Sequence, residues 1–404
     1  MKAAIATPRR RLSRPVAFWM LSLTLGFLLF ASSAPSPLYI VYQARWHFSP
    51  ITLTSVFAVY VLALLVSLLF AGSLSDRVGR RPVLAVALLV EALAMALFGV
   101  AHGVDVLFAA RIVQGLATGV ATGALSASLI DLQPDARPQL GALVSSSAPL
   151  LGLAAGAVVS GLLVQYGPDP LRLVYWLLLG VFVLATAGVL AMPEPVTASR
   201  ESWARLLRPR IGIPDAARGT FAAVAPILVA TWALGGLYLS LGPSLAVSLL
   251  HTSSHVTGGL VIAALAGTGA LFSVLLRNHA PEHVMIAGAA LLSAGVAISL
   301  WGLDERQTAL FFAGSVIAGM GFGPGFLGAF RTITALAPPT ERAGLIAAIY
   351  VVSYLGFSLP AIAAGVAVTH QGLLHTTNVY GGAVIALALW ATGVSELRRR
   401  RAAA

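Results

Sequence analysis

Charged side chains are scarce in this sequence: Asp, Glu, Lys and Arg together make up 10% of its 404 residues. In soluble domains this share is usually about a quarter, because charged groups cover much of the surface. The hydrophobic share here is 58%, and the mean hydropathy is +0.90. Such a chain cannot cover itself with polar side chains, so we expect it to lie mainly in lipid. An ordinary soluble enzyme is excluded.

Cysteine is absent, which excludes disulfides, thiolate metal sites and cysteine nucleophiles. The histidines fall in or near the expected loops and form no cluster, so we expect no metal site and no cofactor. The sequence also lacks a phosphate-binding G-x-x-x-x-G-K-[ST] motif and a visible nucleophile–base set. We therefore do not expect an enzyme.

Long apolar runs, by contrast, are abundant. A helix needs about 20 apolar residues to cross a hydrocarbon core about 30 Å thick, and a spanning segment must be helical because lipid offers its backbone no hydrogen-bond partner. Twelve segments qualify, namely residues 16–40, 50–71, 82–101, 105–131, 139–165, 172–192, 218–249, 256–276, 283–302, 308–335, 343–368 and 378–396. We therefore predict an all-α polytopic membrane protein with twelve transmembrane helices.

Basic residues are distributed unequally between alternate connections. If the N-terminus is inside, the inner segments hold 20 of the 25 Lys and Arg residues, whereas the outer loops hold only Arg45, Arg172 and Arg306. This asymmetry places both termini in the cytoplasm. We read the first apolar run as an uncleaved helix in the plasma (inner) membrane. Because the positive charges lie in short loops between apolar segments, we expect membrane lipid, and not nucleic acid, as a partner.

The two halves of the chain resemble each other. Residues 132–161 align without gaps on residues 336–365, and a weaker match sets Pro37 against Pro243. A parallel duplication of six spans is typical of transporters whose substrate site lies between the halves. We expect a first bundle over 1–192, a cytoplasmic linker over 193–217 and a second bundle over 218–404. The linker fits either an interfacial helix or a solvated basic segment.

A cluster of charges follows the second span, in GSLSDRVGRRPVL at residues 72–84. It closely resembles the signature loop of the major facilitator superfamily, G-x-L-x-D-R-x-G-R-R/K-x-x-L, which lies between spans two and three. The resemblance implies the major facilitator fold, two pseudo-symmetric six-helix bundles around a cavity that opens alternately to each side. It also implies a cytoplasmic gate, for which the candidates are Gly72, Asp76, Arg77, Gly79, Arg80 and Arg81.

The gate candidates imply a local geometry. We expect a tight turn at Gly79 that brings Asp76 close to the arginines. In the family this loop meets the cytoplasmic end of the eleventh helix and latches the outward-open state, which here points to the segment from Pro339 to Arg342. The alternative is a loop that only anchors the topology. The equivalent loop of the second half, residues 275–284, is degenerate, so a latch there should be weaker.

The fourth span contains a polar stripe. Arg111, Gln114, Thr118 and Thr122 recur at i, i+3, i+7 and i+11, so they share one helix face. The pattern Arg-x-x-Gln-Gly resembles the family's fourth-span motif, whose arginine faces the central cavity and is tied to proton coupling. Because an arginine inside a span is costly in lipid, we favour a cavity-facing Arg111 over one that reaches the outer membrane surface.

Glu91 lies near the middle of the third span. An ionised, unpaired carboxylate at this depth would be very costly, so it must be protonated or partnered. Arg111 on the next helix is a candidate partner. Two hypotheses stay open: Glu91 carries the coupling proton, or it forms a structural ion pair or a neutral helix contact. The third span of this family is usually peripheral, which speaks against the carrier.

The fifth span matches the family's antiporter motif only in part. The core G-x-x-x-G-P-x-x-G-G is represented by Gly152, Gly156 and Gly161, with Ala157 in place of the proline and Ser160 in place of a glycine. These departures weaken an antiporter assignment without removing it. We expect the three glycines to form a tightly packed, bendable hinge.

Other polar side chains in apolar spans are candidates for the cavity wall, with packing as the alternative. The segment SPLY at residues 36–39 resembles the first-span motif of drug-exporting members, and two tyrosines recur four residues apart on the eleventh span. The cavity-lining candidates are Ser36, Tyr39, Gln114, Thr118, Thr122, Tyr238, Tyr350 and Tyr354.

The resemblance implies a secondary active transporter driven by protons. We expect a monomer that exports a small amphipathic organic compound by alternating access, as in the twelve-span drug/proton antiporter branch. The few charges in the spans argue against a highly charged substrate. The alternatives are proton-coupled uptake or exchange of a neutral metabolite such as a sugar, and a non-transporting membrane receptor. The internal duplication and the polar stripe speak against the receptor.

Overall fold

The computed structural model describes residues 12–71, 74–137, 139–196, 211–249, 254–338 and 341–403. Within these ranges all regular structure is helical. The helices are α1 (Arg14–Ser33), α2 (Pro35–Trp46), α3 (Pro50–Ala71), α4 (Leu74–Val78), α5 (Arg80–Gly99), α6 (Val104–Leu132), α7 (Leu140–Tyr166), α8 (Leu173–Ala191), α10 (Asp215–Ser240), α11 (Gly242–Ser248), α12 (His255–Leu276), α13 (Pro281–Asp304), α14 (Thr308–Thr334), α15 (Arg342–Gln371) and α16 (Leu373–Ala403).

The described residues contain twelve candidate membrane spans that are long and apolar enough to cross a bilayer, with α1 and α2 forming one of them. The prediction of an all-α, twelve-span membrane protein is thereby confirmed. Hydropathy sets the span positions because each must match the thickness of the hydrocarbon core. Much of the predicted linker, residues 197–210, lies outside the described residues.

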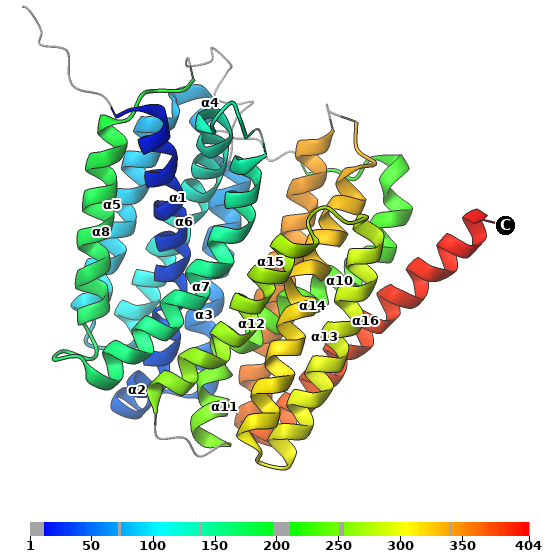
Figure 1. Ribbon diagram of the computed structural model, residues 1–404. Coiled ribbons are helices and arrows are strands. Elements are labelled where there is room, and N and C mark those ends of the chain that lie inside the picture. Colours follow the sequence, from blue (N-terminus) through cyan, green and yellow to red (C-terminus); the bar gives the residue numbers. More distant parts are fainter. Residues whose placement is uncertain are drawn as a thin grey trace, which may run out of the picture.

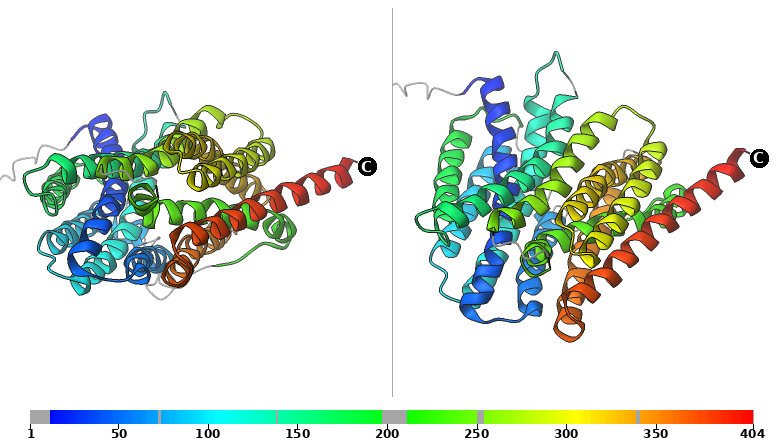
Figure 2. Two further views of the ribbon diagram at one scale, coloured as in Figure 1. Left: turned by 90° about the horizontal axis from the view of Figure 1, so that it is seen from below. Right: turned by 60° about the horizontal axis from the view of Figure 1, so that its bottom comes forward.

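The helices form two groups, α1–α8 and α10–α16, which stand side by side in Figures 1 and 2. Each group has its own buried apolar core. The core of the first group also takes in Leu237, Ile262 and Ala361 of the second group. The two groups are therefore joined by apolar packing as well as by the linker.

The first and seventh predicted spans are both broken in the structure, at equivalent places. The helix breaks between α1 and α2 at Ala34, where Pro35 and Pro37 follow, and between α10 and α11 at Leu241, where Pro243 follows. Proline lacks the backbone N–H that a helix interior requires and clashes with the preceding turn. Pro37 and Pro243 are the pair that the internal alignment matched, so the duplication includes this break.

The two groups meet mainly through α7 with α12 and α3 with α15. A Cβ atom added to Gly259 of α12 would overlap the carbonyl of Ala157 in α7, and one added to Gly365 of α15 would overlap Thr54 of α3. Small residues permit this close approach. The backbone N–H of His255 also donates to Gln165 Oε1 over 2.9 Å. All of these contacts lie toward the predicted outer end of the molecule.

Candidate functional site: a central cavity and a buried polar cluster

A cavity of about 1270 Å³ lies between the two groups of helices. Its lining runs from Ser32, Tyr60 and Tyr238 in the middle of the spans to Arg137 and Arg277 in loops at the predicted cytoplasmic end. Because the lining reaches exposed loop residues at this end, the cavity is accessible from the predicted cytoplasmic side. At the outer end the two groups are in contact, so the cavity is closed there. Its volume suits a ligand of drug size, for which pockets are typically about 300–1,000 Å³.

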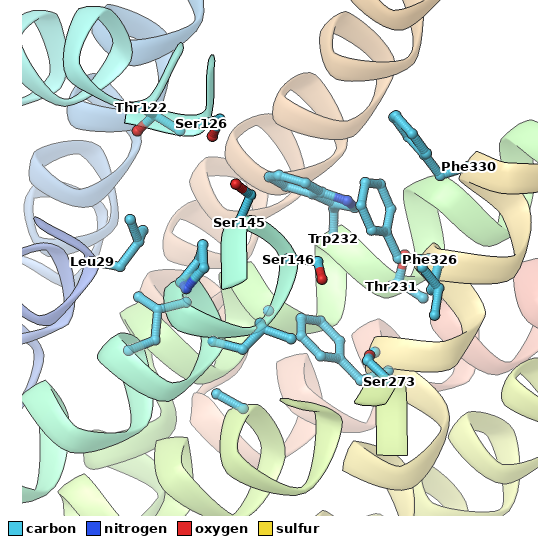
Figure 3. A pocket seen from close by; sticks show the side chains of 18 of the residues that line it. Leu29, Thr122, Ser126, Ser145, Ser146, Thr231, Trp232, Ser273, Phe326 and Phe330 are labelled. Atoms are coloured by element: carbon cyan, nitrogen blue, oxygen red, sulfur yellow. The ribbon is translucent and has the colours of Figure 1, made fainter. Parts of the chain in front are cut away.

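The wall from the first group is rich in hydroxyl groups. Figure 3 shows Thr122, Ser126, Ser145 and Ser146 on this side of the cavity. Thr118 and Thr122, both predicted from the α6 stripe, are among the lining residues. These side chains offer hydrogen bonds to a ligand without adding charge.

The opposite wall is an aromatic cluster. The ring of Trp232 in α10 lies 4.7 Å from Tyr354, 5.5 Å from Phe357 and 5.5 Å from Phe326, measured between centroids. The ring of Tyr350 extends this cluster on α15, with its centroid 5.9 Å from that of Tyr354. The predicted candidates Tyr238, Tyr350 and Tyr354 are thus found in the lining, whereas the phenylalanines were not predicted because their apolar rings give no signal against an apolar span.

Arg111 lies inside the first group and is fully buried. Its Nε donates to Tyr39 Oη over 2.7 Å, and its Nη1 donates to the carbonyl of Ser32 over 3.1 Å and to Gln114 Oε1 over 2.7 Å. The guanidinium also lies against the rings of Tyr60, Tyr39 and Phe98, with 5.0 to 5.6 Å to their centroids. Arg111 therefore lies neither at the membrane surface nor in the described cavity lining.

Glu91 of α5 is also fully buried. Its Oε1 accepts a hydrogen bond from Gln114 Nε2 and its Oε2 accepts one from Thr118 Oγ1, each over 3.2 Å. The side-chain amide of Gln114 thus bridges Glu91 and Arg111. We call Glu91, Arg111 and Gln114 the buried polar cluster. Both of the charged side chains are hydrogen-bonded, as the sequence required, and the side-chain amide of Gln114 is the partner that they share.

Only one layer of side chains separates the buried polar cluster from the cavity. Thr118 both lines the cavity and donates to Glu91. The hydroxyls of Ser32 and Tyr60, which also line the cavity, are 2.6 Å apart. A short polar route therefore leads from the cavity to the carboxyl group of Glu91.

Three of the predicted cavity residues, Ser36, Tyr39 and Gln114, are buried and do not belong to the described lining. For Tyr39 and Gln114 the reason is that they bind Arg111. A guanidinium inside an apolar bundle needs acceptors, and Tyr39 and Gln114 supply them. The polar stripe of α6 therefore has two environments. Its Arg111 end lies in the buried polar cluster, and its Thr122 end lines the cavity.

The signature loop forms α4, a turn and the start of α5. Gly79 has φ +106°, a conformation that favours glycine. The turn brings Asp76 Oδ1 to 2.5 Å from Arg80 Nη1, the geometry predicted from the sequence. Arg77, on α4, is half-buried, and Gly72 lies outside the described residues.

Two acidic residues that the sequence analysis missed hold this loop. Asp131, at the end of α6, pairs with Arg80 Nε at 3.1 Å. Glu194 accepts from the backbone N–H groups of Arg80 and Arg81 over 2.8 and 3.0 Å, so a carboxylate occupies the N-terminus of α5. Arg81 also donates to the carbonyl of Leu190. The position of Asp131 and Glu194 among the basic inner segments could have singled out these two acids, although not the residues that they pair with.

These partners of the loop all belong to the first group of helices. Contacts to the expected latch segment are not among these bonds of Asp76, Arg80 and Arg81, and Pro339 and Thr340 of that segment lie outside the described residues. A cavity open to the predicted cytoplasmic side requires the latch to be released. Its formation in an outward-open state stays a prediction.

The fifth-span glycines lie at helix crossings. Cβ atoms at Gly152 and Gly156 would overlap the carbonyls of Gly26 and Phe30 in α1. A Cβ atom at Gly161 would lie 2.8 Å from the carbonyl oxygen of His255 in α12. The glycines therefore allow α7 to pack closely on both neighbours, and their role as a hinge stays a prediction.

Comparisons with known proteins agree with this architecture. The chain is 26% identical over 299 residues to the multidrug resistance protein MdtL of Shewanella sp. (strain ANA-3), covering 72% of this chain and 73% of the relative. It is 46% identical over 66 residues to multidrug resistance protein D of Escherichia coli (strain K12), covering 16% of this chain and 17% of the relative.

Solved structures with the same fold include a mutant of the nucleoside transporter NupG. It superimposes with a TM-score of 0.72 at 15% identity, over 95% of this chain and 100% of NupG. A POT family transporter in complex with 5-aminolevulinic acid gives a TM-score of 0.73 at 13% identity, over 95% of this chain and 96% of the transporter. At these identities the likeness shows the fold alone.

The family model described as Major Facilitator Superfamily matches residues 21–361. This match spans most of the chain and confirms the resemblance seen in the signature loop. The chain belongs to the Major Facilitator Superfamily.

Proposed function

We propose that this protein exports a small amphipathic organic compound across the plasma (inner) membrane in exchange for protons, as a monomer with both termini in the cytoplasm. The observation that carries the proposal is the central cavity, which lies between the two groups of helices and is closed at the predicted outer end. Binding in this state would take substrate from the cytoplasm. The relatives named as multidrug resistance proteins support the same direction.

In this proposal the two groups of helices are two bundles that rock against each other. The apolar contacts at the outer end would open, while the signature loop would form its latch at the cytoplasmic end. Asp131 and Glu194 already hold the signature loop in its folded conformation. Closing the cytoplasmic end would therefore require only new contacts between this loop and the second bundle.

We propose Glu91 as the residue that carries the coupling proton. It is the acid of the buried polar cluster, and Thr118 links it to the cavity. A substrate or water that displaces the Thr118 hydroxyl would change the hydrogen bonds of this carboxyl group. Such a change couples occupancy of the cavity to binding of a proton.

The test uses the purified protein in liposomes with an imposed pH gradient. Export coupled to protons predicts that substrate added to acidified vesicles releases protons from them. Movement of substrate and protons in the same direction would indicate uptake of a metabolite instead. Absence of flux for every compound that binds would indicate a receptor and contradict the proposal.

Glu91→Gln tests the coupling residue. The amide keeps the size of the side chain but cannot release a proton, so we expect proton-coupled flux to fall at least about tenfold while binding in the cavity persists. The control is Glu282→Gln, an exposed acid at the start of α13, which should transport normally. Undiminished coupled transport by Glu91→Gln would remove Glu91 from the mechanism.

A further inference from the structure

The charges around the cavity all have the same sign. Its charged lining residues are Arg137, Arg277 and Arg331, and the described lining contains no Asp or Glu. Arg137 belongs to the first bundle and the other two belong to the second, so arginines flank the cytoplasmic mouth from both sides. The buried polar cluster behind the wall contributes no net negative charge, because Glu91 is accompanied by Arg111.

One of these arginines is held in place at the mouth. Arg331, near the end of α14, donates from Nη1 to the carbonyl of Arg277 over 2.7 Å and to that of His279 over 3.2 Å. It therefore crosses the turn between α12 and α13, where Arg277 itself is exposed. The two guanidinium groups share one turn and keep further N–H donors for a ligand.

The arginines adjoin the aromatic wall. Arg331 directly follows Phe330, whose ring lies 5.9 Å from Phe326 and 6.3 Å from Tyr350. Figure 3 shows Phe330, Phe326 and Trp232 on the same side of the cavity. A flat apolar body placed against these rings would therefore have its end close to the positive charges.

Aromatic walls can also bind organic cations through the faces of the rings. Several of these ring faces are already in contact with other side chains of the protein. Trp232 packs with its neighbours at interplanar angles of 69° to 78°, so ring edges cover ring faces. On the opposite wall, the ring of Tyr60 already carries the guanidinium of Arg111. A cation in the cavity would be repelled by the arginines of the mouth, and the rings of Trp232 and Tyr60 would offer it little free face.

We propose that the substrates are flat, largely aromatic organic acids with a single negative charge, and that Arg277 and Arg331 bind the anionic group. This inference rests on the proposed function, because it takes the cavity as the transport site. A planar guanidinium matches a carboxylate through paired N–H donors. Lipophilic cations of the same size are then poor ligands.

The test measures equilibrium binding to the purified protein in detergent, without a gradient. Three probes share one ring system: 2-naphthylacetate, 2-naphthylacetamide and 2-naphthylmethyl-trimethylammonium. We expect the acid to bind at least about fivefold more tightly than the amide, and the cation to bind most weakly. The preference for the acid should shrink as NaCl increases, because salt screens exposed charges.

Arg277→Gln and Arg331→Gln should each reduce the preference for the acid over the amide to less than about twofold, with the affinity for the amide unchanged. If Arg331→Gln does not fold because the hydrogen bonds of Arg331 to the turn are lost, Arg277→Gln still tests the inference. The control is Arg306→Gln, an exposed arginine of an outer loop outside the lining, which should keep the preference.

Equal affinity for the acid and the amide, tighter binding of the cation, or a preference that survives Arg277→Gln would overturn the inference. Because binding is measured without a gradient, this outcome is separate from a failure of proton-coupled export. A protein that binds the acid selectively but moves no protons would contradict the proposed function and leave the ligand class standing.

Discussion

At the scale of single residues, Gln114 connects the two buried charges of the first bundle. Its Oε1 accepts from Arg111 and its Nε2 donates to Glu91 and to the carbonyl of Ala31. An amide can serve both charges because it has an acceptor at one end and donors at the other. Arg111 also donates to Tyr39 and to the carbonyl of Ser32, so these hydrogen bonds can hold it in place while Glu91 gains or loses a proton.

Replacement of this amide should therefore be costly. In Gln114→Leu the guanidinium of Arg111 loses a buried acceptor and Glu91 loses a donor, so we expect the free energy of unfolding to fall by about 3 kcal/mol. Chemical unfolding in detergent micelles measures this. The control Gln307→Leu changes an exposed glutamine that precedes α14. A loss of stability no larger in Gln114→Leu than in the control would show that the bridge is not structural.

At the scale of elements, the signature loop is fixed by its backbone as much as by its charges. Gly79 combines φ +106° with ψ 153°, and a Cβ atom there would lie 3.0 Å from Glu194 Oε2. The same carboxylate caps the start of α5. Without this glycine, α4 could not turn into α5 while Glu194 stays in place.

Gly79→Ala should destabilise the loop by about 2 kcal/mol, because this backbone region is almost restricted to glycine. We also expect transport to fall, since the turn positions Asp76 and Arg80. Gly103→Ala is the matched control: Gly103 is an extended loop glycine whose added Cβ would meet nothing within 4 Å. Transport and unfolding should be measured for both, and similar effects in the two variants would refute the account of the turn.

The sequence predicted the elements better than their partners. The spans followed from hydropathy and the turn followed from Gly79, because both depend on local properties of the chain. The pairing of Arg80 with Asp131 and of α5 with Glu194 could not be predicted, since these contacts join distant segments. The prediction that Gln114 lines the cavity was wrong. A helical stripe shows which residues share one face of a helix, but it does not show what that face packs against.

At the scale of the whole molecule, the two bundles touch at one end and separate at the other. Figure 1 shows α7 and α12 meeting toward the end opposite the start of α1. The arginine-flanked mouth lies at the other end, and the aromatic wall lies between the two. In the proposed function this arrangement is one state of an alternating cycle, in which transport requires the closed end to open.

The most direct test of this cycle locks the closed end. The chain has no cysteine, so introduced pairs can be cross-linked cleanly. Gln165→Cys with His255→Cys joins α7 of the first bundle to α12 of the second, where the native residues share a hydrogen bond. The control pair, Asp304→Cys with Asn378→Cys, joins α13 to α16 within the second bundle, also at a native hydrogen bond.

A reducible cross-linker should abolish export by the 165/255 pair, and reduction should restore it, because the outer end can then open again. The same treatment of the 304/378 pair should leave export unchanged, since both residues move with one bundle. If the protein cross-linked at 165/255 still exported substrate at the rate of the reduced protein, the two bundles would not need to separate there, and the alternating-access account would be wrong.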